Sequence, residues 1–66
     1  MEHAPVVARA MRDAGFDAKV MHSLRVDVSL KNRIINTSEV ETVIEREFGE
    51  IQFRLHRTSV GVSIAW

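Results

Sequence analysis

Apolar and polar residues follow two different rhythms along the chain, and these rhythms predict its elements. Apolar residues recur every three or four positions over residues 5–14 and 38–48, as on one face of a helix. They alternate with polar residues over residues 18–31, 51–56 and 59–66, as in half-buried strands. The predicted element order is therefore α-β-α-β-β.

The first predicted helix has signals at both ends. Pro5 suits the first turn, where its missing N–H would have no intrahelical partner. Gly15 is expected to end the helix in a left-handed conformation, which lets Phe16 fold back on the last turn. Its apolar stripe consists of Val7, Ala10, Met11 and Ala14.

The long predicted strand over residues 18–31 has one apolar side. His22 falls on this side, and a break near Ser23 would divide the strand. The apolar positions expected to face the core are Val20, Leu24, Val26, Val28 and Leu30.

The second helix is expected to begin with a capping box. Ser38 and Glu41 have the required spacing, in which each side chain accepts from the backbone N–H of the other residue. Gly49 is expected to end this helix. Its apolar face consists of Val40, Val43, Ile44 and Phe48.

Together these elements predict an α+β fold, a two-layer α/β sandwich over residues 1–66 as one domain. Both helices are expected on one face of a three-stranded sheet. The last strand would lie between the other two, which makes a split β-α-β unit with a right-handed crossover. A fourth strand would form if residues 33–36 paired with residues 26–30.

The opening of the chain has one family resemblance. The first helix, the turn Ala14-Gly15-Phe16 and the strand after it resemble the opening of small RNA-binding toxin domains. The later element order departs from that of these domains. The sequence therefore assigns the chain to no family.

Composition narrows the possible classes of protein. The chain of 66 residues has no cysteine, which excludes disulfides, cysteine-based zinc sites and thiol nucleophiles. So short a chain has a marginal core, which favours self-association as a homodimer. No apolar run could span a bilayer, and the start lacks a signal peptide, so we expect a cytoplasmic protein. Its size is typical of bacterial or phage regulators.

The net charge of zero conceals a segregation along the chain. Residues 37–50 hold five glutamates against one arginine, whereas residues 18–36 hold four cationic side chains against one aspartate. The second helix is therefore acidic and the strands are basic. The sheet face away from the helices should carry Lys19, Arg25, Asp27, Ser29, Gln52, Arg54, His56, Ser59 and Ser63.

This polar face has two interpretations. It is either a solvated sheet face, as is common in antiparallel sheets, or a docking face for a protein or a nucleic-acid backbone. Phe53 and Trp66 follow the apolar alternation, so the face lacks the aromatic rings on which single-stranded nucleic acid stacks.

The chain offers little chemistry for catalysis or cofactor binding. The spacing of His3, His22 and His56 matches no metal-ligand pattern. The hydroxyl residues lack a nucleophile-elbow context, and the three glycines are too dispersed for a phosphate loop. We therefore expect no enzyme activity, cofactor, metal or small-molecule substrate.

Strand edges and their apolar neighbours are further candidates for binding, because a free edge can pair with another chain. Ile34 and Ile35 belong to neither helix stripe. Either one or both fill the core between the long strand and the second helix, or they form an apolar patch for a partner. Trp66 likewise belongs to the core or anchors an interface.

The sequence thus predicts a small non-enzymatic interaction or regulatory module that binds another macromolecule through its open sheet face or a strand edge. The partner would be another protein or a second copy. The alternative is a nucleic-acid-binding protein that contacts phosphates. The candidate partner-binding residues are Lys19, Arg25, Lys31, Arg33, Arg54, His56 and Arg57.

Overall fold

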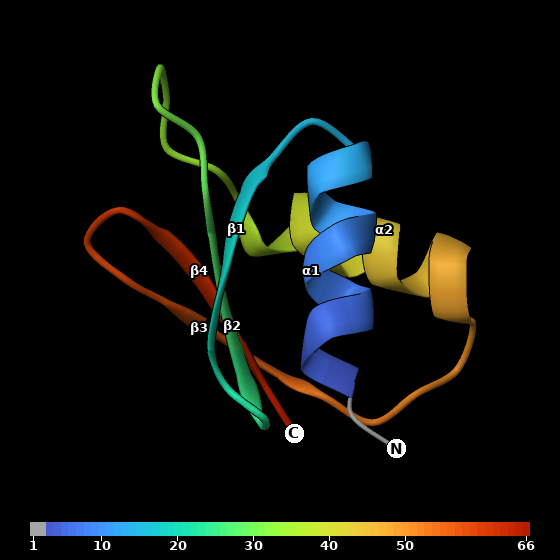
Figure 1. Ribbon diagram of the computed structural model, residues 1–66. Helices are drawn as coiled ribbons and strands as arrows, with labels where there is room; N and C mark the ends of the chain where they lie inside the picture. Colours follow the sequence, from blue (N-terminus) through green and yellow to red (C-terminus); the bar gives the residue numbers. More distant parts are fainter. Residues whose placement is uncertain (1–2) are drawn as a thin grey trace.

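A computed structural model describes residues 3–66 as two helices packed on one face of a four-stranded antiparallel sheet (Figure 1). The α+β class and the position of both helices on one face confirm the prediction. The elements are α1 (His3–Asp13), β1 (Asp17–His22), β2 (Arg25–Ser29), α2 (Thr37–Phe48), β3 (Arg54–Arg57) and β4 (Gly61–Ala65).

The strand order in the sheet is β1-β2-β4-β3. The last strand, β4, pairs antiparallel with both β2 and β3, so β2 and β3 run parallel to each other with β4 between them. This confirms the predicted split β-α-β unit, in which α2 connects β2 to β3. Both hairpins, β1–β2 and β3–β4, join strands that are neighbours in the sheet.

The fourth strand does not come from residues 33–36, which form no strand. Instead, the predicted long strand over residues 18–31 folds into the hairpin β1–β2, with Ser23 and Leu24 in its turn. The observed order is therefore α-β-β-α-β-β.

The hairpin also corrects three predicted core positions, His22, Leu24 and Val20; Val20 shares the face of Val26 but is 38% exposed on the edge strand. The register of β1 shifts between Val20 and His22, which places His22 opposite Arg25. His22 is therefore exposed on the polar side of the sheet, and its Nδ1 accepts a hydrogen bond from the Leu24 N–H at 3.1 Å. Leu24, in the turn, is 53% exposed. The extra residue in β1 thus turns His22 away from the helices.

Helix α1 ends as predicted, although it begins two residues before Pro5. Gly15 has a φ of +100° and donates its N–H to the Arg12 carbonyl at 3.0 Å. Phe16 donates its N–H to the Met11 carbonyl, also at 3.0 Å. These two bonds make a Schellman motif. Ala14, expected on the apolar stripe, is exposed, and the buried stripe is Ala4, Val7, Ala8 and Met11.

The predicted capping box of α2 is displaced by two residues. The N-cap is Asn36 rather than Ser38. Glu39, not Glu41, reaches back, and its carboxylate accepts from the Asn36 N–H at 2.8 Å. Ser38 instead offers its carbonyl to the Thr42 hydroxyl inside the helix.

The core lies between the sheet and the two helices. It resolves the two interpretations of the isoleucine pair: Ile35 is fully buried, whereas Ile34 is 65% exposed. Val60, predicted as a core position of the last strand, lies in the β3–β4 turn and is 68% exposed. Phe53 and Trp66 pack against the core without being fully buried. The buried apolar set on the sheet is Val26, Val28, Val62 and Ile64.

Candidate interaction surface

The strand register assembles the polar face of the sheet into rows that cross the strands. Residues directly opposite each other in antiparallel strands point to the same face. Because Val26 and Val28 face the helices, their neighbours in β2 face the other way. We call this second face the open face. Its first row is His22, Arg25, Ala65 and Arg54, its second is Lys19, Asp27, Ser63 and His56, and its third is Asp17, Ser29 and Gly61.

The first row concentrates positive charge. Arg25 lies in β2 and Arg54 in β3, with the small side chain of Ala65 between them on β4. Arg25 donates its Nε–H to Asp27 at 3.1 Å, while Arg54 forms no salt bridge within residues 3–66. We call this the cationic row.

Small side chains along β4 form the floor of the open face. Gly61, Ser63 and Ala65 lie on the open face and alternate with Val62 and Ile64, which face the helices; Gly61 and Ser63 are buried as well. The neighbouring strands carry the longer side chains Arg25, Asp27, Arg54 and His56 on this face. Small residues at every second position of the last strand were visible in the sequence, but their role depends on β4 being central.

Negative charge gathers at the other end of the open face. Asp17 and Asp27 line a hollow of about 330 Å³ together with Lys19 and Ser29. The open face is therefore polarised along its strands, with the cationic row at one end and two carboxylates toward the other. The sequence indicated a polar, mildly basic face, and the register adds where its charges lie along the strands.

The remaining predicted binding residues lie elsewhere. Lys31 and Arg33 are exposed in the connection between β2 and α2. Arg57 is opposite Val62 and so belongs to the helix side of β3, although its side chain is exposed. The structure thus brings together Lys19, Arg25, Arg54 and His56, and separates them from Lys31, Arg33 and Arg57.

Arg33 is engaged in the start of α2. Its two Nη groups donate to the Glu39 carboxylate at 2.9 and 2.6 Å. The hydrogen bond from Arg33, followed by that from the Asn36 N–H, lowers the pKa of Glu39 from 4.5 to about 2. The same pair raises the pKa of Arg33. A bidentate pair of this kind leaves Arg33 less available to a partner than Arg54.

The Glu39 pair predicts a pH dependence of stability. Because the pKa of Glu39 is lower in the folded state, its contribution is present above about pH 4.5 and is lost as the pH falls toward 2. We expect the difference in free energy of unfolding between the wild type and Glu39→Gln to shrink across this window. Urea unfolding at several pH values measures it. The exposed Glu47→Gln variant is the control, and an equal response of both variants would contradict the assignment.

The second row places Ser63 between Asp27 and His56, three residue types found in hydrolase triads. In such a triad the histidine lies between the nucleophile and the acid. Here Ser63 lies in the middle, so Asp27 and His56 are two strands apart, on the order of 10 Å. Asp27 cannot orient His56 at that separation. The row has the geometry of a polar surface rather than of a nucleophilic site.

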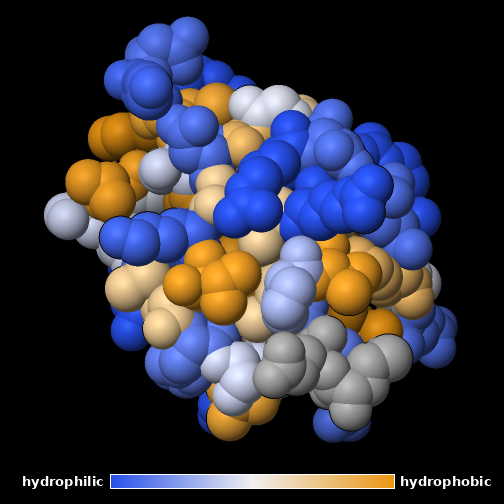
Figure 2. Space-filling view, in the orientation of Figure 1, coloured by the Kyte–Doolittle hydropathy of each residue, from blue (hydrophilic) through white to orange (hydrophobic). Residues whose placement is uncertain are grey.

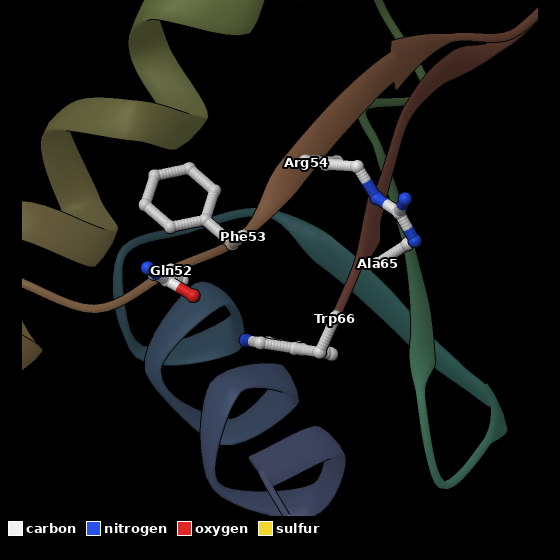
Figure 3. A pocket seen from close by; sticks show the side chains of 5 residues that line it. All are labelled: Gln52, Phe53, Arg54, Ala65 and Trp66. Atoms are coloured by element: carbon white, nitrogen blue, oxygen red, sulfur yellow. The ribbon is translucent and has the colours of Figure 1, made fainter.

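A second hollow, of about 310 Å³, lies where β3 begins and β4 ends (Figure 3). It is lined by Gln52, Phe53, Arg54, Ala65 and Trp66. The Trp66 Nε1 is buried and has no hydrogen-bond partner in the described part of the chain. Figure 3 shows the indole nitrogen directed toward the side of Gln52, whereas Arg54 extends in the opposite direction past Ala65. The ring of His3 stacks on Trp66, with centroids 5.8 Å apart.

The side of the molecule that carries α1 has a different character. Its hydrophobic side chains form separate patches between charged ones (Figure 2). Exposed apolar residues of α1 and β1 include Val6, Val20 and Met21. Patches broken up by charge are typical of a solvated surface rather than of an apolar docking face.

Residues 3–66 offer neither a metal centre nor a membrane-spanning helix. No group of three or more histidine or carboxylate side chains is placed to hold a metal ion. None of the helices in that range is long and apolar enough to cross a membrane.

Comparison with protein-family models, curated proteins and solved structures finds no match to this chain.

Proposed function

We propose that this chain is a small non-enzymatic interaction module that binds another macromolecule through the cationic end of its open sheet face. The observation that carries the proposal is the cationic row. Arg25 and Arg54 lie on either side of Ala65, on a face that neither helix covers. Arginine supplies planar, bidentate contacts to carboxylates or phosphates.

The electrostatics of the row support a polar partner over an apolar one. Arg54 has no carboxylate partner within the described range, and Arg25 uses only its Nε–H on Asp27. Both guanidinium groups thus keep donors for an anionic ligand. The small floor residues Ser63 and Ala65 let a partner approach the backbone of β4 between them.

Charge reversal of the row tests this role. We expect Arg25→Glu plus Arg54→Glu to lower partner retention by about tenfold or more, because two contacts to an anionic surface become repulsive. The protein is immobilised, exposed to a native lysate with and without nuclease, and the retained molecules are quantified. Retention that survives nuclease identifies a protein partner.

The matched control reverses two arginines on the helices. Arg9 and Arg46 are exposed on α1 and α2, so Arg9→Glu plus Arg46→Glu makes the same change in net charge away from the sheet. It should retain the partner. If both double variants retained equal amounts, the cationic row would not be the binding surface.

Nucleic-acid binding is the second candidate, because Lys19, Arg25 and Arg54 share the open face. Contacts to phosphates would make affinity fall steeply with salt. Asp17 and Asp27 on the same face, and the engagement of Arg33 by Glu39, both count against this candidate. Nuclease-sensitive, strongly salt-dependent retention in the same experiment would favour it.

The homodimer and a cytoplasmic location stay predictions. Sedimentation at micromolar concentration measures the first: a species of only 7.5 kDa would contradict a dimer.

A further inference from the structure

The two edges of the sheet differ in how their backbone groups are satisfied. In an antiparallel strand the N–H and C=O of successive residues point alternately to the two neighbouring positions. The Thr58 N–H donates to the Gly61 carbonyl at 2.9 Å, and the Trp66 N–H donates to the Leu24 carbonyl at 3.2 Å. Together with the register, these two bonds show which residues of β3, β4 and β2 direct their backbone groups toward which neighbouring strand.

At the β1 edge, the outward positions are Ala18 and Val20. The exposed carbonyl of Ala18 is already occupied, because the Arg12 guanidinium donates to it through Nε at 3.1 Å and Nη2 at 2.9 Å. Helix α1 thus covers this edge with an arginine, as proteins commonly do to prevent strand addition.

At the β3 edge, the outward positions are Leu55 and Arg57. Arg54 and His56 pair with β4, so the N–H and C=O groups of the two residues beside them point away from the sheet. Within residues 3–66, no side chain donates a hydrogen bond to the Leu55 or Arg57 carbonyl. This edge therefore presents unpaired backbone groups to another chain.

The β3 edge is also the more positively charged of the two. Arg54 and His56 flank it on the open face, and Arg57 flanks it on the helix side. None of them forms a salt bridge among the described residues. Pairing of two copies through β3 would bring these cationic side chains together, which costs free energy. An acidic strand would have the complementary charge.

We propose that the β3 edge binds an extended acidic segment of a partner protein, which adds to the sheet as a fifth strand. This rests on the proposed interaction role and specifies its partner. Backbone hydrogen bonds to Leu55 and Arg57 supply the pairing, and Arg54, His56 and Arg57 select carboxylate side chains.

The hollow at the start of β3 extends the same site. It contains Trp66, whose indole N–H is buried and directed away from Arg54, so the ring reports binding at this end of β3 rather than donating to the docked segment. On the other side of Phe53, Glu45 and Glu50 line a separate hollow of about 330 Å³. Their negative charge would repel an acidic segment. The segment therefore lies over residues 54–57 and not over residues 49–51.

The probe is a short capped peptide in which glutamate alternates with threonine. Trp66 is the only tryptophan and the chain has no tyrosine, so its fluorescence reports binding at the hollow. Amide hydrogen exchange then locates the contact. At a peptide concentration of about ten times the Kd, amide exchange at Leu55 and Arg57 should slow about tenfold. Exchange at Ala18 and Val20, on the β1 edge, should be unchanged.

Matched variants distinguish a loss of charge complementarity at the β3 edge from a general effect of charge reversal on the fold. Arg57→Glu should weaken peptide binding at least about tenfold, whereas Arg9→Glu on α1 should not change it. A peptide with lysine in place of glutamate should not bind.

Two results would overturn the inference. One is protection of Ala18 and Val20 instead of Leu55 and Arg57. The other is tighter binding of a single-stranded DNA oligonucleotide than of the acidic peptide. If a captured partner needs Arg25 and Arg54 but leaves the Leu55 and Arg57 amides unprotected, the interaction role stands and the β3 edge proposal fails.

Discussion

Replacing Ile35 with alanine should lower the free energy of unfolding by about 3 kcal/mol. Ile35 lies in the connection between β2 and α2, yet its side chain is completely buried in the core. Truncation removes apolar contacts and leaves a cavity that a small core cannot readily close. Because a domain this small has only about 3–5 kcal/mol of stability from its core, we expect the variant to be close to unfolded. Urea denaturation followed by Trp66 fluorescence measures the loss.

Ile34→Ala is the matched control for this prediction. It makes the same chemical change one position earlier, where the side chain is 65% exposed, so the expected change is within about 0.5 kcal/mol. Equal losses from the two variants would show that the connection does not insert Ile35 between the sheet and α2.

Gly61→Ala should also destabilise the fold strongly, by about 2–3 kcal/mol. Gly61 begins β4 opposite Ser29, and a Cβ there would overlap the Val28 carbonyl oxygen and lie 3.0 Å from the Ser29 Cα. These obstacles are backbone atoms, so relief requires β4 to move away from β2. In a domain of this size, the midpoint of thermal unfolding should fall by roughly 10–20 °C.

The control for Gly61→Ala lies on the same strand and the same face. Ser63→Ala removes only a hydroxyl and should cost less than about 1 kcal/mol. Thermal unfolding followed by circular dichroism compares the two variants. A wild-type midpoint for Gly61→Ala would mean that β4 does not approach β2 as closely as described.

The sequence pattern predicted the fold class, the central position of β4 and a break near Ser23, but not that this break is the turn of an antiparallel β1–β2 hairpin. The hairpin escaped prediction because its register pairs even-numbered residues with even-numbered ones. In the hairpin Val20 pairs with Val26 and Ala18 pairs with Val28, so even-numbered residues share one face. One continuous strand would give the same alternation. Only the turn residues distinguish the two, and Ser23-Leu24 carries no glycine, asparagine or proline signal.

The sequence predicted which residues lie on the open face but not how they align across the strands. Alternation assigned Lys19, Arg25, Arg54 and His56 to one face, and the structure places them there. It could not show which of them align across strands, because that depends on register. Likewise, nothing in the sequence linked Arg12 to the Ala18 carbonyl, since that contact depends on how α1 packs beside β1.

The position of β4 has a consequence for synthesis of the chain. It leaves the ribosome after the other elements of this fold, yet among residues 3–66 it is the strand that pairs with β3 and joins β3 to the β1–β2 hairpin. Until β4 emerges, β3 has no partner and the apolar sides of β2 and the two helices cannot close. Nascent chains ending before residue 61 should therefore remain sensitive to protease, and folding should begin only after translation has passed β4.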